Sequence, residues 1–336
     1  TQWADGFTQE DYKALVADFY KPLFDRALMG AYPPGSTFKP ANGLILLQEN
    51  IITPSTAYPC YHGFVSGGLK VGCHSHGSPL PLKPALQTSC NAYFCYGFKA
   101  MVDRRSKYGT SAEAFETWKK HLVSLGYGYR LGTDLPGESR GFIPNAKFYN
   151  KIYGEGRWSA NTIISVSIGQ GEILATPMQI ANLCATIANR GWFITPHVVK
   201  EIEDTVMPQD LIARRYPTID ARHFADVAEG MRMAVTGGTC RLAALPDIEV
   251  AGKTGTAQNP HGKDHSAFIG FAPYDNPKIA VCAYVENAGF GATYGVPIGS
   301  LVIEKYLTGK ISDQRKYLEQ RMLESNTIIY SGVKKH

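Results

Sequence analysis

The stretch Tyr32-Pro33-Pro34-Gly35-Ser36-Thr37-Phe38-Lys39 organises the rest of this chain. Its Pro-Pro-Gly segment predicts a stiff turn, because proline fixes φ and glycine adopts conformations that other residues avoid. The apolar run that follows predicts a buried helix, with Pro40 in its first turn, where no intrahelical N–H is needed. We therefore expect Ser36 at the helix N-terminus and Lys39 one turn away on the same face.

This pairing of a serine with a lysine suits nucleophilic chemistry. A serine hydroxyl is a weak nucleophile, and a lysine amine that burial or neighbouring cations keep neutral can take its proton. A helix N-terminus also favours the negative charge that develops when a carbonyl carbon is attacked. Because S-x-x-K is a short pattern that also occurs as an ordinary surface pair, the catalytic interpretation depends on further motifs.

Two such motifs follow in order. Ser89-Cys90-Asn91 is an S-x-N, and Lys253-Thr254-Gly255-Thr256 is a K-T-G-T in a segment that predicts a strand. The order S-x-x-K, S-x-N, K-T-G is the signature set of penicillin-binding proteins and serine β-lactamases. Each motif is weak or moderate evidence alone, but the three in this order in one chain are a strong signal.

The chain resembles the transpeptidase domain of class B penicillin-binding proteins, in particular the elongation-type penicillin-binding protein 2 group. The resemblance includes the nucleophile segment and runs from about Tyr32 to the C-terminal helix. It also rests on four connecting segments: Gly132-Thr133-Asp134-Leu135-Pro136-Gly137-Glu138, Ser167-Ile168-Gly169-Gln170-Gly171, Ala175-Thr176-Pro177 and Phe271-Ala272-Pro273.

The resemblance implies a peptidoglycan D,D-transpeptidase. Ser36 would attack the carbonyl between two D-alanines of a stem peptide, and an amine of a second stem peptide would resolve the acyl-enzyme into a cross-link. β-Lactam antibiotics would acylate Ser36 and stay. Lys39 would be the base; Ser89 would either relay a proton to the leaving amine or serve only as a helix cap. Asn91 would hydrogen-bond the substrate backbone or hold Lys39.

The K-T-G-T segment would bind the substrate. Lys253 brings positive charge toward the terminal carboxylate, and Thr254 brings a hydroxyl. The strand can pair with an extended peptide, and Gly255 would let that peptide approach closely. The resemblance further implies an oxyanion hole made by the backbone N–H groups of Ser36 and Thr256.

Other functions of the same fold remain open at this point. A serine β-lactamase has the same motifs but must activate water, and the glutamate segment E-x-x-L-N of class A enzymes is not found in this sequence. A D,D-carboxypeptidase would differ in the acceptor. A sensor or scaffold would bind a β-lactam or peptidoglycan without turnover.

The composition limits the class of protein and the kinds of partner that can be expected. The 336 residues are 44% hydrophobic and 19% charged, so a sizeable core is expected and disorder is not. The net charge of +5 is mild, and no basic stripe with interleaved aromatics is present, so a nucleic-acid partner is not expected.

Localisation and partners follow from the resemblance. Family members carry an N-terminal membrane anchor and a pedestal domain, and we expect 1–336 to be the transpeptidase domain without either, since no 18-residue apolar run or signal peptide is present. The expected setting is the bacterial inner membrane, with a single-pass anchor and the catalytic domain in the periplasm. The expected partner is the membrane glycosyl-chain polymerase of the elongation machinery.

Seven cysteines are present, an odd number. Cys60, Cys73, His76 and Cys90 form a candidate tetrahedral structural zinc site, with His74 as the competing histidine. The alternatives are a Cys60–Cys73 disulfide, because the family works outside the cytoplasmic membrane, and free thiols in a loop. No cofactor is expected to be required for catalysis.

Periodicity and turn residues predict an α+β fold, an antiparallel sheet flanked by helices, of the penicillin-binding protein and serine β-lactamase type. The strands that usually precede the nucleophile in this fold are not evident. Inward stripes are expected in an N-terminal helix (Tyr12, Leu15, Val16, Phe19) and in a closing helix (Ile298, Leu301, Val302, Tyr306). The expected helices are 8–30, a catalytic helix to about 50, 91–101, 111–125, 177–190, 220–235 and 297–308; the expected strands are 248–254, 267–272 and 278–285; 53–82 is expected to be loop.

Overall fold

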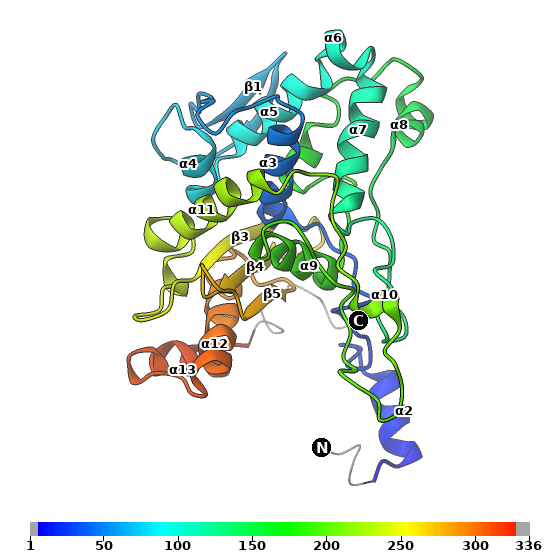
Figure 1. The fold of residues 1–336 in the computed structure, drawn as a ribbon, viewed down its shortest axis with the longest axis vertical. Coiled ribbons are helices and arrows are strands. Elements are labelled where there is room, and N and C mark those ends of the chain that lie inside the picture. The colour runs from blue at the N-terminus through cyan, green and yellow to red at the C-terminus, as the bar shows by residue number, and fades with distance from the viewer. Residues whose placement is uncertain (1–5, 327–336) are drawn as a thin grey trace.

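The computed structural model describes residues 6–326 and has the α+β architecture that the sequence predicts (Figure 1). In chain order the elements are α2 (Gln9–Ala17), the 3₁₀ helix η1 (Gly35–Phe38), α3 (Lys39–Gln48), β1 (Gly63–Ser66), β2 (Leu69–Gly72), α4 (Leu82–Gln87), α5 (Asn91–Val102), α6 (Arg105–Tyr108), α7 (Ser111–Ser124), α8 (Ala146–Tyr153), the 3₁₀ helix η2 (Ile164–Ile168), α9 (Pro177–Ala188), α10 (Gln209–Ile212), α11 (Arg222–Gly237), the 3₁₀ helix η3 (Arg241–Ala243), β3 (Ala251–Ala257), β4 (His265–Ala272), β5 (Ile279–Val285), α12 (Gly295–Thr308), the 3₁₀ helix η4 (Asp313–Arg315) and α13 (Lys316–Glu324).

The main sheet is an antiparallel meander in the order β3-β4-β5, so β3 is an edge strand. The register pairs Lys253 with Ile269 and Ala257 with His265. Among the described residues no strand precedes the nucleophile segment, and the second sheet is the hairpin β1-β2.

The core divides at the sheet because successive strand residues point to opposite faces. Ile269 and Phe271 belong to a large cluster with the helices that include α3, α5, α7 and α9, and Phe268 belongs to a smaller cluster with Val296 and Ile303 of α12. Figure 1 shows α3, α5 and α7 beyond one side of the sheet and α12 at the other. In this arrangement α9 and α11 pack on the sheet, and the turn η1, which leads into α3, packs on β3.

Most predicted elements are confirmed within a few residues. Pro40 lies in the first turn of α3, Pro177 begins α9, and α11 ends at Gly237. Helices α5 and α7 occupy the segments that their aromatic periodicity indicates.

The prediction for the N-terminal segment is wrong in two respects. Thr8 does cap a helix, through a capping box with Asp11, but the helix ends at Ala17 rather than near residue 30, and none of its residues is buried. The expected stripe residues Tyr12, Val16 and Phe19 are all at least half exposed. Helix α2 projects from the body (Figure 1), so its local cap stabilises it rather than a packed face.

Strand β3, the first strand of the main sheet, also begins later than predicted, at Ala251 instead of Ile248. The side chain of Arg232 explains the shift, because it donates a hydrogen bond to the carbonyl oxygen of Val250 at 3.1 Å. The partner strand β4 ends at Ala272, and the following Pro273 has no N–H with which to extend the pairing.

Two further predictions need correction. The 53–82 segment is not loop throughout, since it contains the hairpin β1-β2.

In α12 the inward face is that of Val296 and Ile303, whereas Val302 and Tyr306 are 49% and 65% exposed. The small Gly299 faces Phe268 of the sheet, and this close approach sets the rotation of the helix.

The apolar helices are all too short to cross a membrane within the described part of the chain.

Candidate active site

The nucleophile segment forms a tight turn that leads into α3. Ser36 lies in η1, immediately after Gly35, whose φ of 54° is in the left-handed region that favours glycine. The Gly35 N–H donates to the carbonyl oxygen of Gly169 at 2.9 Å. A Cβ atom on Gly35 would lie 2.8 Å from the carbonyl oxygen of Thr256, so the turn packs directly on β3.

Lys39 begins α3 and is fully buried. Its Nζ donates to the backbone carbonyl oxygen of Ser89 at 2.6 Å, to Ser89 Oγ at 3.2 Å and to Asn91 Oδ1 at 2.6 Å. Burial lowers the pKa of Lys39 to about 8, against the opposing influence of the nearby cysteines. The neutral amine, the form that a base requires, is therefore more populated near neutral pH than in an ordinary lysine.

Ser89 lies in the turn between α4 and α5 with a φ of 58°. A non-glycine residue in the left-handed region costs about 1–3 kcal/mol, and the turn places both oxygens of Ser89 against Lys39. The alternative role of Ser89 as a helix cap is not what the structure shows. Cys90 is the N-cap of α5, and its Sγ accepts from the N–H of Tyr93 at 3.3 Å.

The second lysine lies on β3. Lys253 is fully buried, and its Nζ donates to the carbonyl oxygen of Thr254 at 3.1 Å. Burial, followed by the charge of Lys39, lowers the pKa of Lys253 to about 7. Thr254 Oγ1 donates to Thr239 Oγ1 at 2.8 Å, which places two hydroxyls beside this lysine.

We expected Gly255 to let a substrate peptide approach β3 closely, and this explanation for the glycine is wrong. A Cβ atom there would lie 2.8 Å from Cγ2 of Thr37 and 3.2 Å from the carbonyl oxygen of Pro34. The absence of a side chain therefore lets β3 pack against the nucleophile turn, and it does not make room for a substrate.

A cleft of about 730 Å³ brings the three motifs together. Ser36, Ser89, Asn91, Thr254 and Thr256 line it. Lys39, Lys253 and Gly255 are buried and are not among the lining residues. The other lining residues are Lys70, Val71, Gly72, His74, Ser165, Ile168, Gln170, Thr239, Gln258, Asp264, Phe290, Gly291 and Ala292.

Sequence reasoning missed several of these residues. Gln170 lies in one of the connecting segments, and its Nε2 donates to the carbonyl oxygen of Thr256 at 3.3 Å. Its glycine-flanked position was a usable signal. Thr239 and Asp264 carry no motif, and only the fold brings them to the cleft.

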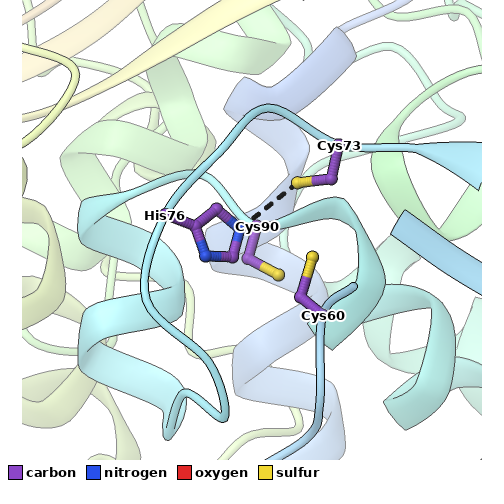
Figure 2. Close-up of side chains that lie close together, drawn as sticks. All are labelled: Cys60, Cys73, His76 and Cys90. Atoms are coloured by element: carbon purple, nitrogen blue, oxygen red, sulfur yellow. Dashed lines mark hydrogen bonds between the residues drawn. The ribbon is translucent and has the colours of Figure 1, made fainter. Parts of the chain in front are cut away.

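Next to the cleft, four potential metal ligands converge (Figure 2). The Sγ atoms of Cys60, Cys73 and Cys90 and a ring nitrogen of His76 all lie within 4.8 Å of one another. Cys60 lies just before the hairpin β1-β2, and Cys73 and His76 follow it, so the hairpin brings these three residues to Cys90 at the N-terminus of α5. The structure thus selects His76 over His74 as the fourth member.

The set fits a tetrahedral metal. Three thiols and one imidazole form a common donor set of structural zinc sites. His76 Nδ1 lies 2.7 Å from the carbonyl oxygen of Gly77, an arrangement that leaves Nε2, 3.4 Å from Cys73 Sγ, free for a ligand. All seven cysteines are free, so the Cys60–Cys73 disulfide is not present in the structure.

The protonation of the thiols is uneven. Hydrogen bonding from Cys90, together with that from His74 and others, lowers the pKa of Cys73. The hydrogen bond with Cys73 and burial raise the pKa of Cys90, and burial raises that of Cys60. The lowered pKa of Cys73 favours cation binding, since each cysteine ligand must lose its proton to bind a metal.

Comparison with known proteins gives one family. The family model described as penicillin binding protein transpeptidase domain matches residues 7–304. The curated protein "Peptidoglycan D,D-transpeptidase MrdA" of Haemophilus influenzae is 33% identical over 94% of this chain and 50% of its own length. The chain spans about half the length of the curated relatives it matches.

Solved structures agree. Pseudomonas aeruginosa PBP2, in complex with WCK 5153, is 30% identical with a TM-score of 0.75, over 92% of this chain and 69% of its own. A structure described as "Structural coordination of polymerization and crosslinking by a peptidoglycan synthase complex" is 31% identical with a TM-score of 0.75, over 91% of this chain and 51% of its own.

Proposed function

This chain belongs to the penicillin-binding protein transpeptidase family, and from that premise we propose that it is a serine-type peptidoglycan D,D-transpeptidase inhibited covalently by β-lactams. The observation that carries the proposal is the position of Lys39. Its buried Nζ contacts Ser89 and Asn91, one turn from Ser36, below the cleft that all three of these residues line.

In the acylation step, Ser36 Oγ attacks the carbonyl carbon between two D-alanines, and neutral Lys39 takes the hydroxyl proton. The backbone N–H groups of Ser36 and Thr256 receive the oxyanion. Ser89, in contact with Lys39 Nζ, passes the proton to the departing D-alanine amine. The acyl group then remains on Ser36 Oγ.

The substrate's terminal carboxylate meets the Thr254 and Thr239 hydroxyls, with Lys253 behind them. An anion at this position favours the charged form of Lys253. Because β3 is an edge strand, the peptide can add to it by backbone hydrogen bonding.

In the second step an amine of another stem peptide attacks the acyl carbon and releases Ser36. A carboxypeptidase would use water, and a β-lactamase would hydrolyse the drug adduct. The names of the curated relatives favour cross-linking.

We also propose that Cys60, Cys73, His76 and Cys90 hold a structural zinc ion. The metal would supply cross-links between the hairpin and α5, and no chemical step depends on it. Its four donors come from segments that the fold brings together.

The partner and the setting remain proposals. A similar solved structure contains a peptidoglycan synthase complex, which supports a membrane glycosyl-chain polymerase as the partner. We place the domain on the periplasmic side of the bacterial inner membrane, because the stem peptides are there.

Intact mass spectrometry after mixing with a penicillin tests the assignment. We expect a persistent one-to-one adduct that Ser36→Ala abolishes. An adduct that disappears while the drug is consumed would instead indicate a β-lactamase, and an adduct on Ser36→Ala would overturn the nucleophile. With a D-Ala-D-Ala peptide and an added amine, a transpeptidase forms the amine conjugate, whereas a carboxypeptidase yields the hydrolysed peptide.

A further inference from the structure

A carboxylate at the end of β5 contacts the segment that leads to the nucleophile, and no step described so far uses it. Glu286 directly follows β5 and is partly buried. Its Oε1 accepts a hydrogen bond from the Tyr32 hydroxyl at 2.8 Å, and its Oε2 accepts one from Arg26 Nε at 2.8 Å. Both donors precede Ser36 closely in the chain, so Glu286 holds the approach to the nucleophile from a distant part of the sequence.

The side chain of Tyr32 is fixed by its ring as well as by its hydroxyl. The ring stacks on that of Tyr284 with 4.7 Å between centroids, and the ring of His265 on β4 meets it edge to face at 5.9 Å. Tyr284 and Glu286 are two residues apart, the spacing that brings strand side chains to the same face of a sheet. The end of β5 therefore contacts Tyr32 twice.

The backbone of Tyr32 connects this contact with the nucleophile turn. Its N–H donates to the carbonyl oxygen of Ala175 at 2.9 Å, and its own carbonyl oxygen accepts from the Ala175 N–H at 2.8 Å. Pro33 and Pro34 come next, and proline fixes φ. The chain from Tyr32 to Ser36 therefore has few free torsions, so a shift of the first residue moves the second.

Arg26 keeps Glu286 in place as an anion. Its guanidinium group also donates to the carbonyl oxygens of Tyr20 at 2.8 Å and Lys21 at 3.2 Å, which holds it against its own segment. Burial alone would raise the pKa of Glu286, but the hydrogen bonds from Arg26 and Tyr32 outweigh it and lower that pKa. Burial and the bond to Glu286 raise the pKa of Tyr32, so its hydroxyl stays protonated and donates to a charged acceptor.

We propose that Glu286 is a positioning residue for acylation, which acts through Tyr32 to hold Ser36 against β3. The oxyanion hole of the proposed mechanism needs the N–H groups of Ser36 and Thr256 to converge, so a shifted turn weakens it in the transition state. The inference rests on the proposed function. Glu286 is not among the residues that line the cleft, so it acts through the turn rather than by contact with the substrate.

The test measures two constants of penicillin acylation by intact mass: the first-order rate constant at saturation and the penicillin concentration that gives half of this rate. We expect Glu286→Ala to lower the rate constant by about tenfold, because small misplacements of reacting groups are costly. The half-saturating concentration should change by less than about twofold, because the turn matters in the transition state. Glu286→Gln should lower the rate constant by about threefold, since its neutral oxygen still accepts from Tyr32.

A second substitution separates a route through Tyr32 from a general effect of the carboxylate. Tyr32→Phe retains the stacking on Tyr284 and removes the hydroxyl, and it should lower the rate constant by about threefold. Adding Glu286→Gln to Tyr32→Phe should then cost less than about twofold more, because both substitutions break the same contact. Effects that multiply in full would overturn the route through Tyr32.

Thermal unfolding of each variant and a matched control complete the design. Glu229→Ala breaks another partly exposed ion pair, with Lys83 on α4, and should leave both constants as in the wild type. If Glu286→Ala does not fold, Glu286→Gln provides the same test. An unchanged rate constant, or a loss that appears only in the half-saturating concentration, would overturn the positioning role and leave the proposed function in place. Failure of the wild type to form an adduct on Ser36 would overturn the proposed function itself.

Discussion

The backbone N–H of Asn91 donates a hydrogen bond to Sγ of Cys73 at 3.2 Å, while its side-chain Oδ1 accepts from Lys39 Nζ at 2.6 Å. One residue thus connects the thiol cluster with Lys39. Its Nδ2 also donates to the carbonyl oxygen of Gly72, the residue before Cys73. The position of Asn91 in the cleft therefore depends on the cluster.

We predict that the purified protein contains one zinc ion and that a chelator lowers both its melting temperature and its rate of acylation by a penicillin. The melting temperature should fall because a bound metal contributes its binding free energy to folding, and chelation removes that contribution. Native mass spectrometry and thermal unfolding, before and after chelation, measure both effects.

The two neighbouring histidines give a matched pair for this prediction. His76→Asn should lose the metal, whereas His74→Asn should retain it, because His76 contributes to the four-donor set and His74 does not. Retention of zinc by His76→Asn would refute the ligand set.

The rate of acylation should rise as the pH increases from 6 to 8. Burial lowers the pKa of Lys39 to about 8, so raising the pH through this range increases the fraction of neutral amine that can accept the Ser36 proton. The rate constant for penicillin acylation across this range provides the measurement. Lys39→Arg, which keeps its charge, should be inactive throughout. A flat wild-type profile would argue against Lys39 as the base.

Gly255→Ala should destabilise the protein and slow acylation. The added methyl would lie 2.8 Å from Thr37 Cγ2 and would push the nucleophile turn away from β3. Overpacking of this kind costs about 1–3 kcal/mol, which denaturant unfolding can resolve. Gly77→Ala is the control, because a Cβ there meets no atom within 4 Å. Equal effects of both substitutions would show that the contact with Thr37 does not matter.

Tyr284→Phe should lower stability by about 1 kcal/mol and slow acylation several-fold. The Tyr284 hydroxyl donates to the carbonyl oxygen of Pro33 at 3.0 Å, and its ring stacks on Tyr32 with 4.7 Å between centroids. The substitution retains the stacking and removes the bond that holds the nucleophile turn against β5. Unfolding and acylation measured beside Tyr306→Phe, at an exposed site, isolate this bond. Unchanged acylation would exclude a positioning role.

The sequence alone determined the features that are encoded locally. Pro40 and Pro177 lie in the first turns of α3 and α9 because of their fixed φ, and apolar periodicity located α5, α7 and the three strands of the sheet. The three motifs, read in order, gave the nucleophile segment and the edge strand that lines the same cleft. The four-donor set was also identified from residue types, although His74 and His76 were not separable by spacing.

The tertiary structure decided what depends on contacts between distant segments. Arg232 donates a hydrogen bond to the carbonyl oxygen of Val250, so β3 begins later in the chain than predicted. The contact between Phe268 and Gly299 sets the rotation of α12. The register of β3 with β4 brings Asp264 into the cleft. Neither local propensity nor periodicity encodes these positions, because each depends on which side chain from elsewhere in the chain occupies the neighbouring space.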